Sequence, residues 1–260
     1  RALLLNKTRS FLTMLGIIIG ITAVIVLISA GQGAQELIVN QVKGIGSNLL
    51  FVIPGGSGKS QFSAPASAQG IIITSLVDSD IKSLRNKLLA PDIEYVSPEV
   101  RGQYTVSYNN VDQIAPVVGE DENFGVVRNI NLTAGNWFTK SDVDGLTQVA
   151  ILGSTIKEDL FGEQDPIGQL VKIKQVSFRV VGVSEPKGVG AFGVDQDTQI
   201  IVPVSTAQKL LLGINHYNLI SIQVKDADSI PLAREEVERI LRYIHKISDP
   251  QKDDFTVRNP

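Results

Sequence analysis

The sequence contains no cysteine and only two histidines, one methionine and one tryptophan among its 260 residues. The absence of cysteine excludes disulfide bonds, thiolate metal sites and a cysteine nucleophile. His216 and His245 lie too far apart along the chain for an HxxxH or HExxH metal motif, so we expect surface or structural roles for them. An excess of positive charge is also lacking. The net charge of −3 gives no sign of a nucleic-acid surface, and we expect no nucleic-acid partner.

Motifs for acid, base or nucleophilic catalysis are missing as well. No GxSxG segment is present, and no serine has an obvious neighbouring base. Asp195 and Asp197 stand in a glycine-bearing stretch from which no EF-hand pattern continues. We expect the run Glu120-Asp121-Glu122 to be a solvated turn or a helix start. The sequence therefore predicts no catalytic, cofactor-binding or metal-binding residue, and no enzyme activity in this chain.

The segment LLFVIPGGSGKS, residues 49–60, is close to a phosphate-binding loop. Such a loop needs a glycine five positions before the glycine of its Gly-Lys-Ser end, and that position is Ile53. The loop must also lead into a helix whose N-terminus faces the phosphate, but residues 61–65 give no helical start. We therefore expect no nucleotide here and interpret residues 55–70 as a small, polar loop.

One long hydrophobic run is present near the start of the chain. Residues 11–30 contain no charged side chain, and as a helix they would span about 30 Å, the thickness of the hydrocarbon core of a bilayer. A secretory signal peptide is the competing interpretation, but its apolar region is usually about 7–15 residues long. We predict a membrane helix. Since Arg1, Lys7 and Arg9 precede it, the positive-inside rule predicts a cytoplasmic N-terminus, with the residues after about 31 outside.

Small residues mark one side of this predicted membrane helix. Gly16 and Gly20 form a GxxxG pair, and Ala23 lies close to the same face. Small residues let a second membrane helix approach closely, so we predict a helix-packing face at these three positions, although glycine is also common in membrane helices without such a role. Residues 35–42 keep the helical spacing of apolar side chains, which predicts a stalk that ends near Gly46.

The region beyond the stalk opens and closes with a similar order of elements. The predicted elements of its two ends are a strand at 49–53, a helix at 75–89, strands at 93–96 and 103–108, and then a strand at 219–224, a helix at 229–244 and a strand at 255–257. Two β-α-β units in this order predict the α+β class, with a ferredoxin-like (porter-like) split βαβ sandwich.

A β-rich stretch separates these two units. Its predicted elements are strands at 114–118, 148–152, 171–173, 178–183 and 199–202, with short helices at 155–161 and 205–212. We interpret it as an inserted subdomain. The predicted organisation is therefore 1–46 for the cytoplasmic N-terminus, membrane helix and stalk, 47–110 for the first part of the porter-like domain, 111–216 for the inserted subdomain and 217–260 for the second part of the porter-like domain.

Seven phrases distributed along the chain carry a resemblance to a known family. They are NKTRSFLTMLGIIIGITAVI (6–25), GSNLLFVIPG (46–55), LTAGNWF (132–138) with Asp142 downstream, LFGEQDPIG (160–168), FRVVGV (178–183), IVP (201–203) and DDFTVRN (253–259). Together and in this order they resemble the MacB-type permeases, a branch of the FtsX-like ABC transporter permeases. The phrase at 160–168 is the most specific, and none is a catalytic motif.

This resemblance implies both a fold and a function. Members of the family have four membrane helices, with a large extracytoplasmic domain between the first and the second and with ATPase domains in the cytoplasm. That domain is similar to a porter-like ferredoxin fold with a β-rich insertion. The chain begins at Arg1 rather than at a methionine, so we expect a fragment of a longer permease. The implied function is to transmit ATP-driven motion to the export of a substrate across the bacterial cytoplasmic membrane.

The resemblance also implies partners. These are an ABC ATPase domain or subunit, which would hold any ATP hydrolysis, a second copy of the permease, and a periplasmic adaptor protein as a further candidate. No cofactor is expected. Two alternatives stay open: a related FtsX-like permease for lipoprotein release or for control of a cell-wall hydrolase, and an unrelated single-span receptor or binding protein.

Overall fold

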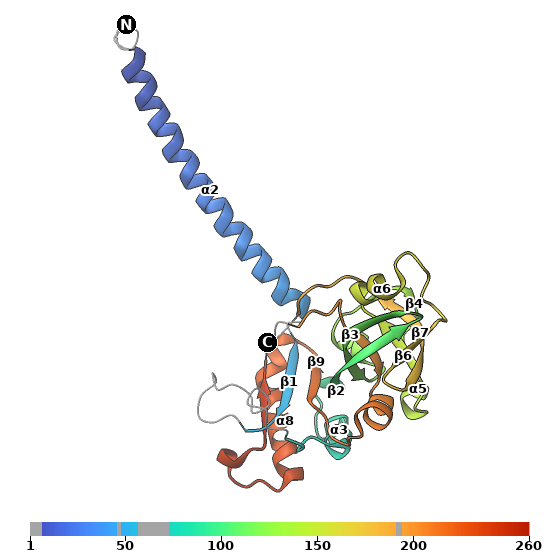
Figure 1. The fold of residues 1–260 in the computed structure, drawn as a ribbon. Helices are drawn as coiled ribbons and strands as arrows, with labels where there is room; N and C mark the ends of the chain where they lie inside the picture. Colours follow the sequence, from blue (N-terminus) through green and yellow to red (C-terminus); the bar gives the residue numbers. More distant parts are fainter. Residues whose placement is uncertain (1–6, 46–47, 57–72, 191–193, 260) are drawn as a thin grey trace. The chain divides into compact units, whose positions relative to one another are not determined.

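The computed structural model of the protein describes residues 7–45, 48–56, 73–190 and 194–259, which form a mixed α and β structure (Figure 1). The chain divides into two compact units, Arg1–Gly44 and Ile45–Pro260. The first unit is helical, and the second contains the strands.

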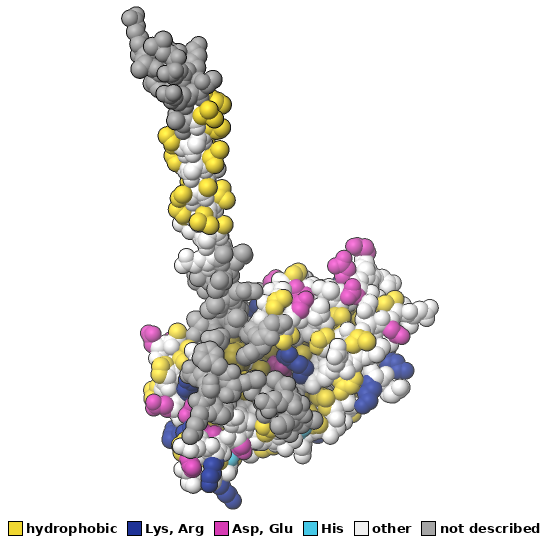
Figure 2. Space-filling model, turned by 60° about the vertical axis from the view of Figure 1, so that its left-hand side comes forward, with side chains coloured by type: hydrophobic (Ala, Val, Ile, Leu, Met, Phe, Trp, Pro, Cys, Tyr) yellow, Lys and Arg dark blue, Asp and Glu magenta, His cyan; other side chains and the backbone are white. Residues whose placement is uncertain are grey.

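The first unit contains helix α2 (Lys7–Ile45), which is 39 residues long. Within it, Met14–Gly33 has a mean hydropathy of 2.5 with none of its residues buried, so it is long and apolar enough to cross a membrane. Hydrophobic side chains cover this stretch in Figure 2. It overlaps the membrane helix predicted at 11–30. The helix then continues without a break to Ile45, as the predicted stalk requires, and Gly46 lies outside the described residues.

The second unit combines strands with short helices. Its strands are β1 (Leu49–Pro54), β2 (Ile93–Tyr108), β3 (Val111–Glu120), β4 (Leu132–Gly135), β5 (Val149–Leu152), β6 (Leu170–Ile173), β7 (Val176–Ser184), β8 (Ile200–Pro203), β9 (Leu219–Val224) and β10 (Phe255–Arg258). Its helices are α3 (Asp78–Leu84), α4 (Phe124–Val127), α5 (Lys140–Asp144), α6 (Ser154–Phe161), α7 (Val204–Thr206) and α8 (Ile230–His245), with the π-helical segment η3 (Ala207–Leu212) and the 3-10 turns η4 (Ala227–Ser229) and η5 (Pro250–Lys252). Every predicted strand has a counterpart here.

The strands form one sheet in the described part of the chain. Its order is β10-β1-β9-β2-β3-β8-β5-β7-β4, and β6 pairs with β2 and β7. The first four neighbours, β10, β1, β9 and β2, are all antiparallel. Further along, β3 is parallel to β8, and β5 is parallel to β7. Segments from both ends of the second unit therefore lie side by side, with β1 between β9 and β10 (Figure 1).

Strand β2 joins the two parts of the sheet. Its first half pairs with β9 as far as Glu99, and its second half pairs with β3 from Val100 onward. We predicted two separate strands, at 93–96 and 103–108, and the residues between them include Pro98 and Gly102, which are typical strand breakers. Pro98 nevertheless stays in register opposite Ile220. At Gly102 a Cβ would meet the ring of Tyr104 at 2.7 Å, so the glycine makes room for that ring.

Strand β1 shows how the sheet is buried on both faces. Successive side chains of a strand point to opposite sides. Leu50 and Val52 belong to the main core, to which α3 and α8 also contribute side chains. Leu49 and Phe51 instead pack with Val127 of α4. A strand covered on both faces reads as a continuous apolar run, which explains the sequence of β1, and each such side chain contributes about 1.5–3 kcal/mol through burial.

Helix α3 is shorter than predicted. We expected a helix at 75–89 with a capping box at Ser75 and Asp78 and with Leu88 facing the core. The helix begins at Asp78 and ends at Leu84. Its cap is formed by Asp80, whose carboxylate accepts a hydrogen bond from the N–H of Val77 at 2.8 Å. Because the chain leaves the helix before Leu88, this side chain is 92% exposed.

Helix α8 follows its prediction closely. It begins at Ile230 with Pro231 in its first turn, and the predicted inward side chains Ala233, Val237 and Leu241 are buried. Three short elements, α4, β4 and α5, were not predicted. They contain only 4, 4 and 5 residues, too few for a hydrophobic period to show in the sequence.

Candidate functional site

The predicted helix-packing face lies on α2. Gly16, Gly20 and Ala23 are spaced four and three residues apart, so they form a stripe along one side of the helix. All three are exposed, and a Cβ added at either glycine would meet no other described atom within 4 Å. The stripe is open to a second helix. Whether one packs there stays a prediction.

His245 occupies a structural position in the second unit, as expected. Its Nδ1 lies 2.6 Å from Asp254 Oδ1, and its Nε2 lies 3.3 Å from Asp80 Oδ1. Burial by itself would lower the pKa of His245, but the hydrogen bond to Asp254 and the charges of both carboxylates outweigh it and raise the pKa above its ordinary value. When it is protonated, the ring of His245 therefore joins α8 to α3 and to the segment before β10.

The acidic run at 120–122 differs from its prediction. A solvated turn is wrong for Glu120 and Asp121, which are 1% and 2% exposed. Glu120 is the last residue of β3 and is paired in register with Pro203 of β8. The other expectation, a helix start, is closer, because α4 begins at Phe124.

Asp121 belongs to a buried cluster that it forms with Ser97, Glu99 and Glu120, and its carboxylate accepts several hydrogen bonds. The hydroxyl of Ser97 donates to its Oδ1, and the guanidinium of Arg85 donates to its Oδ2. The backbone N–H of Asn123 also donates to Oδ1, at 3.1 Å. Burial raises the pKa of Asp121, and the contacts with Ser97 and Arg85 oppose that rise. The carboxylate thus joins the C-terminal end of α3, strand β2 and the start of α4.

Glu120 is the member of the cluster that resists ionisation. Burial raises its pKa well above the ordinary value, and the negative charges of Glu99 and Asp121 raise it further. Its partner Glu99 also forms an ion pair with Arg101 at 2.7 Å. Glu120 Oε1 is buried without a hydrogen-bond partner among the described residues. The arrangement therefore favours the protonated form of Glu120 more than an exposed position would.

The position of the cluster gives it a structural role. Ser97 and Glu99 lie in β2 just before Val100, where the strand exchanges β9 for β3 as its partner. The described residues contain no group of three His, Cys, Asp or Glu side chains arranged to hold a metal ion. The sequence singled out Glu120 and Asp121 but gave no sign that Ser97 and Glu99 join them, because these two residues lie between the strands predicted at 93–96 and 103–108.

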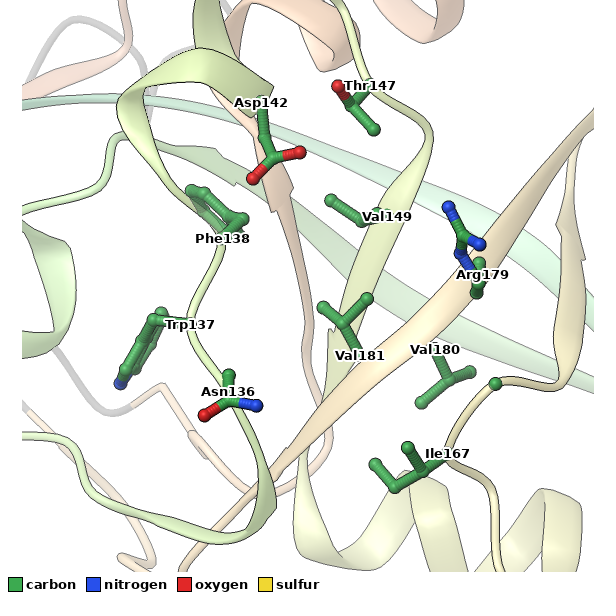
Figure 3. A pocket seen from close by; sticks show the side chains of 11 residues that line it. Asn136, Trp137, Phe138, Asp142, Thr147, Val149, Ile167, Arg179, Val180 and Val181 are labelled. Carbon is green, nitrogen blue, oxygen red and sulfur yellow. The ribbon is translucent and has the colours of Figure 1, made fainter.

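A pocket of about 390 Å³ lies in the part of the sheet formed by β4, β5 and β7 (Figure 3). Its apolar lining includes Val149 of β5 and Val181 of β7, while Asp142 and Arg179 stand at its rim. The N–H and hydroxyl groups of Thr139 both donate to Asp142 Oδ2 at 2.8 Å. These bonds lower the pKa of Asp142, so the rim carries a stable negative charge beside the positive charge of Arg179.

Three phrases of the family resemblance meet at this pocket. The pocket is lined by residues of the segments 132–138, 160–168 and 178–183. Gly135 has a φ of +80°, and a Cβ there would lie 2.0 Å from the carbonyl oxygen of Val181. The next residue, Asn136, donates its N–H to that same carbonyl at 2.9 Å, and Gly168 donates to the carbonyl of Val180 at 2.8 Å. Both loops are therefore fastened to β7 by their backbones.

Trp137 packs beside the same pocket. Its ring packs edge-on against Phe124 at 6.4 Å and against Phe138 at 6.0 Å, between ring centres. A Cβ at Gly125 would lie 2.5 Å from the indole, so this glycine makes room for it. The ring is half-buried, which suits an anchoring role, and it also lines the pocket.

Two further expectations concern loops. Residues 57–60, which include the whole Gly-Lys-Ser end of the segment considered as a phosphate loop, lie outside the described residues. Asp195 and Asp197 lie in the stretch from which no EF-hand pattern continues. Asp197 accepts hydrogen bonds from the backbone N–H groups of Lys187 and Gly188 at 2.7 and 2.9 Å. Asp195 Oδ1 accepts from the N–H of Asp197. These aspartates therefore stabilise a turn.

Comparison with known proteins gives a consistent result along the chain. A family model described as the MacB-like periplasmic core domain matches residues 10–240. A macrolide export ATP-binding/permease protein MacB of Chlorobaculum tepidum is 34% identical over 255 residues, covering 98% of this chain but 38% of the relative. A pyoverdine export ATP-binding/permease protein PvdT of Pseudomonas savastanoi is 32% identical over the whole chain, and 37% of that relative is covered.

Solved structures show the same fold. The periplasmic region of MacB from Actinobacillus actinomycetemcomitans aligns with a TM-score of 0.70 and 24% identity, covering 85% of this chain and 93% of that one. The extracellular domain of the noncanonic ABC-type transporter YknZ from Gram-positive bacteria aligns with a TM-score of 0.64 and 21% identity, covering 82% and 100%. At these identities the likeness concerns the fold alone.

Proposed function

Because the chain belongs to the MacB-like periplasmic core domain family, we propose that it is the extracytoplasmic core, with the first membrane helix, of an ABC transporter permease that exports a substrate. The observation that carries this proposal is the extent of the family match. Residues 10–240 include both the apolar stretch of α2 and the sheet of the second unit. The chain spans a little over a third of the relatives' length, so the other membrane helices and the ATPase belong to the complete protein.

In this proposal the chain itself performs no chemistry. Its charged side chains support this role: Asp121 and His245 form contacts that join secondary-structure elements, and Asp197 stabilises a turn. Cytoplasmic ATP hydrolysis would move α2, and the second unit would pass the movement to cargo or to a partner outside. The names of the relatives, which include macrolide and pyoverdine export, support the export of small molecules.

The fold of the second unit supports a finer assignment. Strands β1, β2, β9 and β10 with α3 and α8 follow the order βαβ–βαβ, and the strand order β10-β1-β9-β2 is the one that a ferredoxin-like sheet has. We assign these elements to a porter-like domain, residues 47–110 and 217–260. The intervening residues 111–216 form the inserted β-rich subdomain, which is attached through β2, β3 and the connection to β9.

The membrane arrangement follows from the same proposal. The N-terminus lies in the cytoplasm, α2 crosses the inner membrane, and the residues after about 31 lie outside it. Two permease copies form a dimer, for which the stripe of Gly16, Gly20 and Ala23 is a candidate helix contact. An ABC ATPase completes the transporter, and a periplasmic adaptor is a candidate partner outside.

A reconstitution of the complete transporter tests this function. The full-length permease with its ATPase is placed in liposomes, and the ATP-dependent movement of a labelled macrolide and of pyoverdine is followed. A second preparation has residues 48–259 replaced by a flexible linker. The proposal predicts ATP-dependent movement of at least one cargo, and its loss in the second preparation while basal ATP hydrolysis remains. Equal transport by both preparations would refute a role for this domain in export.

A further inference from the structure

A second depression adjoins the pocket of Figure 3. It has a volume of about 430 Å³, and its lining includes Leu146, Leu170 and Ser177. The two depressions share Thr147 and Arg179, which line both of them. The two depressions therefore adjoin each other at these residues, and we call the two together the groove. All of its lining residues belong to the described part of the second unit.

Arg179 lines both depressions, and its charge acts on the nearby carboxylate of Asp142 without a direct hydrogen bond or ion pair between them. It lies on β7, its side chain is exposed, and its backbone N–H is already bonded to the carbonyl of Gln148. No hydrogen bond or ion pair of its guanidinium is found among the described residues. The carboxylate of Asp142 accepts its hydrogen bonds from Thr139, where it caps α5, and therefore leaves the N–H donors of Arg179 open. A guanidinium with all its donors free is suited to a carboxylate.

Apolar surface lies on both sides of this charge. On one side Val149, Val181 and Ile167 line the first depression. On the other side Leu170 lines the second depression and is 60% exposed, which is unusual for a leucine within a strand. A ligand that filled the whole groove would need an acidic group at its centre and an apolar group at each end.

An extended polypeptide supplies such a pattern directly. In a strand-like segment the side chains of residues i, i+2 and i+4 point to the same side, about 7 Å apart. A compact small molecule would fill one depression and leave the other empty. We propose that the groove binds an extended segment of a partner protein in which one acidic side chain, placed on Arg179, is flanked two residues away on each side by apolar side chains. This inference goes beyond the proposed function and does not depend on it.

The protein contains its own reporter for this test. Trp137 is the one tryptophan of the chain, it lines the first depression, and its ring is half-buried. The full chain in detergent micelles is titrated with the blocked peptide acetyl-LSESL-amide, which has no aromatic residue of its own. Tryptophan emission is followed, and acetyl-LSKSL-amide serves as the charge-reversed control. The expected result is a saturable change in emission with the acidic peptide and a dissociation constant at least about fivefold weaker for the lysine peptide.

Two variants make the test specific. Arg179→Glu should reverse the preference, so that the lysine peptide binds more tightly than the acidic one. Lys209→Gln removes an exposed positive charge that lies outside the groove and should leave both affinities unchanged. Far-ultraviolet circular dichroism checks that both variants are folded. The inference is overturned if neither peptide binds, if both bind equally to the parent chain, or if Arg179→Glu leaves the preference unchanged.

Discussion

His245 of α8 and Asp80 of α3 face each other across the second unit, with 3.3 Å between Nε2 and Oδ1. Asp80 is completely buried, and the other ring nitrogen of His245 is engaged by Asp254. Since α3 follows β1 and α8 follows β9, this contact joins segments that are far apart in the sequence. It fixes the two helices to each other in the part of the fold assigned to the porter-like domain.

The contact makes stability depend on pH. The pKa of His245 is raised in the folded chain, so its stabilising contribution is complete below the ordinary value of about 6.5 and is lost as pH rises through the folded value. The difference in unfolding free energy between the parent chain and His245→Gln should therefore fall by on the order of 1 kcal/mol above about pH 6.5. Urea unfolding at several pH values measures it. A difference that stays constant or grows with pH would contradict the assignment.

Replacing Glu120 is predicted to stabilise the protein at neutral pH, whereas His245 is predicted to contribute stability at low pH. Its raised pKa means that the unfolded chain loses a proton near the ordinary value of about 4.3 while the folded chain retains it, so stability falls as pH rises above that point. Glutamine resembles the protonated acid in shape and cannot ionise. Glu120→Gln should raise the melting temperature at neutral pH by about 2–4 °C, with the gain disappearing near pH 4. Thermal melts at both pH values test this, and a lowered melting temperature at neutral pH would show that Glu120 is needed as a carboxylate.

Gly135 is predicted to be indispensable for packing, and Gly168 provides a matched control. Both have φ near +80°, but a Cβ at Gly135 would lie 2.0 Å from the carbonyl oxygen of Val181, whereas a Cβ at Gly168 would meet nothing within 4 Å. Gly168→Ala should cost about 1 kcal/mol from backbone strain, and Gly135→Ala about 2–3 kcal/mol because the strand must also shift. Chemical denaturation of the two variants measures the difference. Equal losses would mean that β4 adjusts freely.

The sequence predicted those helices and strands whose hydrophobic pattern can be seen within a single segment. Helix α8 has its buried side chains at helical spacing, from Ala233 through Val237 to Leu241, and β1 is a continuous apolar run. Both could be recognised without knowing what covers them. The end of α3 could not, because Leu88 continues the helical spacing of α3 although the chain has already left the helix.

The buried acids and the groove depend on contacts between distant segments. Asp121 is buried because Arg85 and Ser97, 36 and 24 positions earlier, supply its hydrogen bonds. No local pattern distinguishes such a residue from a solvated one. The groove is a similar case. The phrases at 132–138, 160–168 and 178–183 carried the resemblance to the family, but only the folded chain shows that they surround one pocket.

The orientation of α2 can be tested by labelling. The basic residues before the apolar stretch predict a cytoplasmic N-terminus. In the full-length permease, which is first freed of any other accessible cysteine, single cysteines are placed at Ser10 and Ser67. A membrane-impermeant maleimide applied to intact spheroplasts should label the cysteine at 67 and not the one at 10, and inverted membrane vesicles should give the reverse. Labelling of both from the same side would contradict a single crossing between them.

The central claim is that movement of the membrane helix reaches the second unit through the continuous helix that ends at Ile45. The most direct measurement is transport by the complete, reconstituted transporter after a short Gly-Ser segment is inserted behind Gln41, compared with an Ala-rich helical insertion of the same length. The account predicts that the flexible insertion preserves ATP hydrolysis but abolishes transport, while the helical insertion retains much of it. Transport at the full rate with the flexible insertion would contradict the claim.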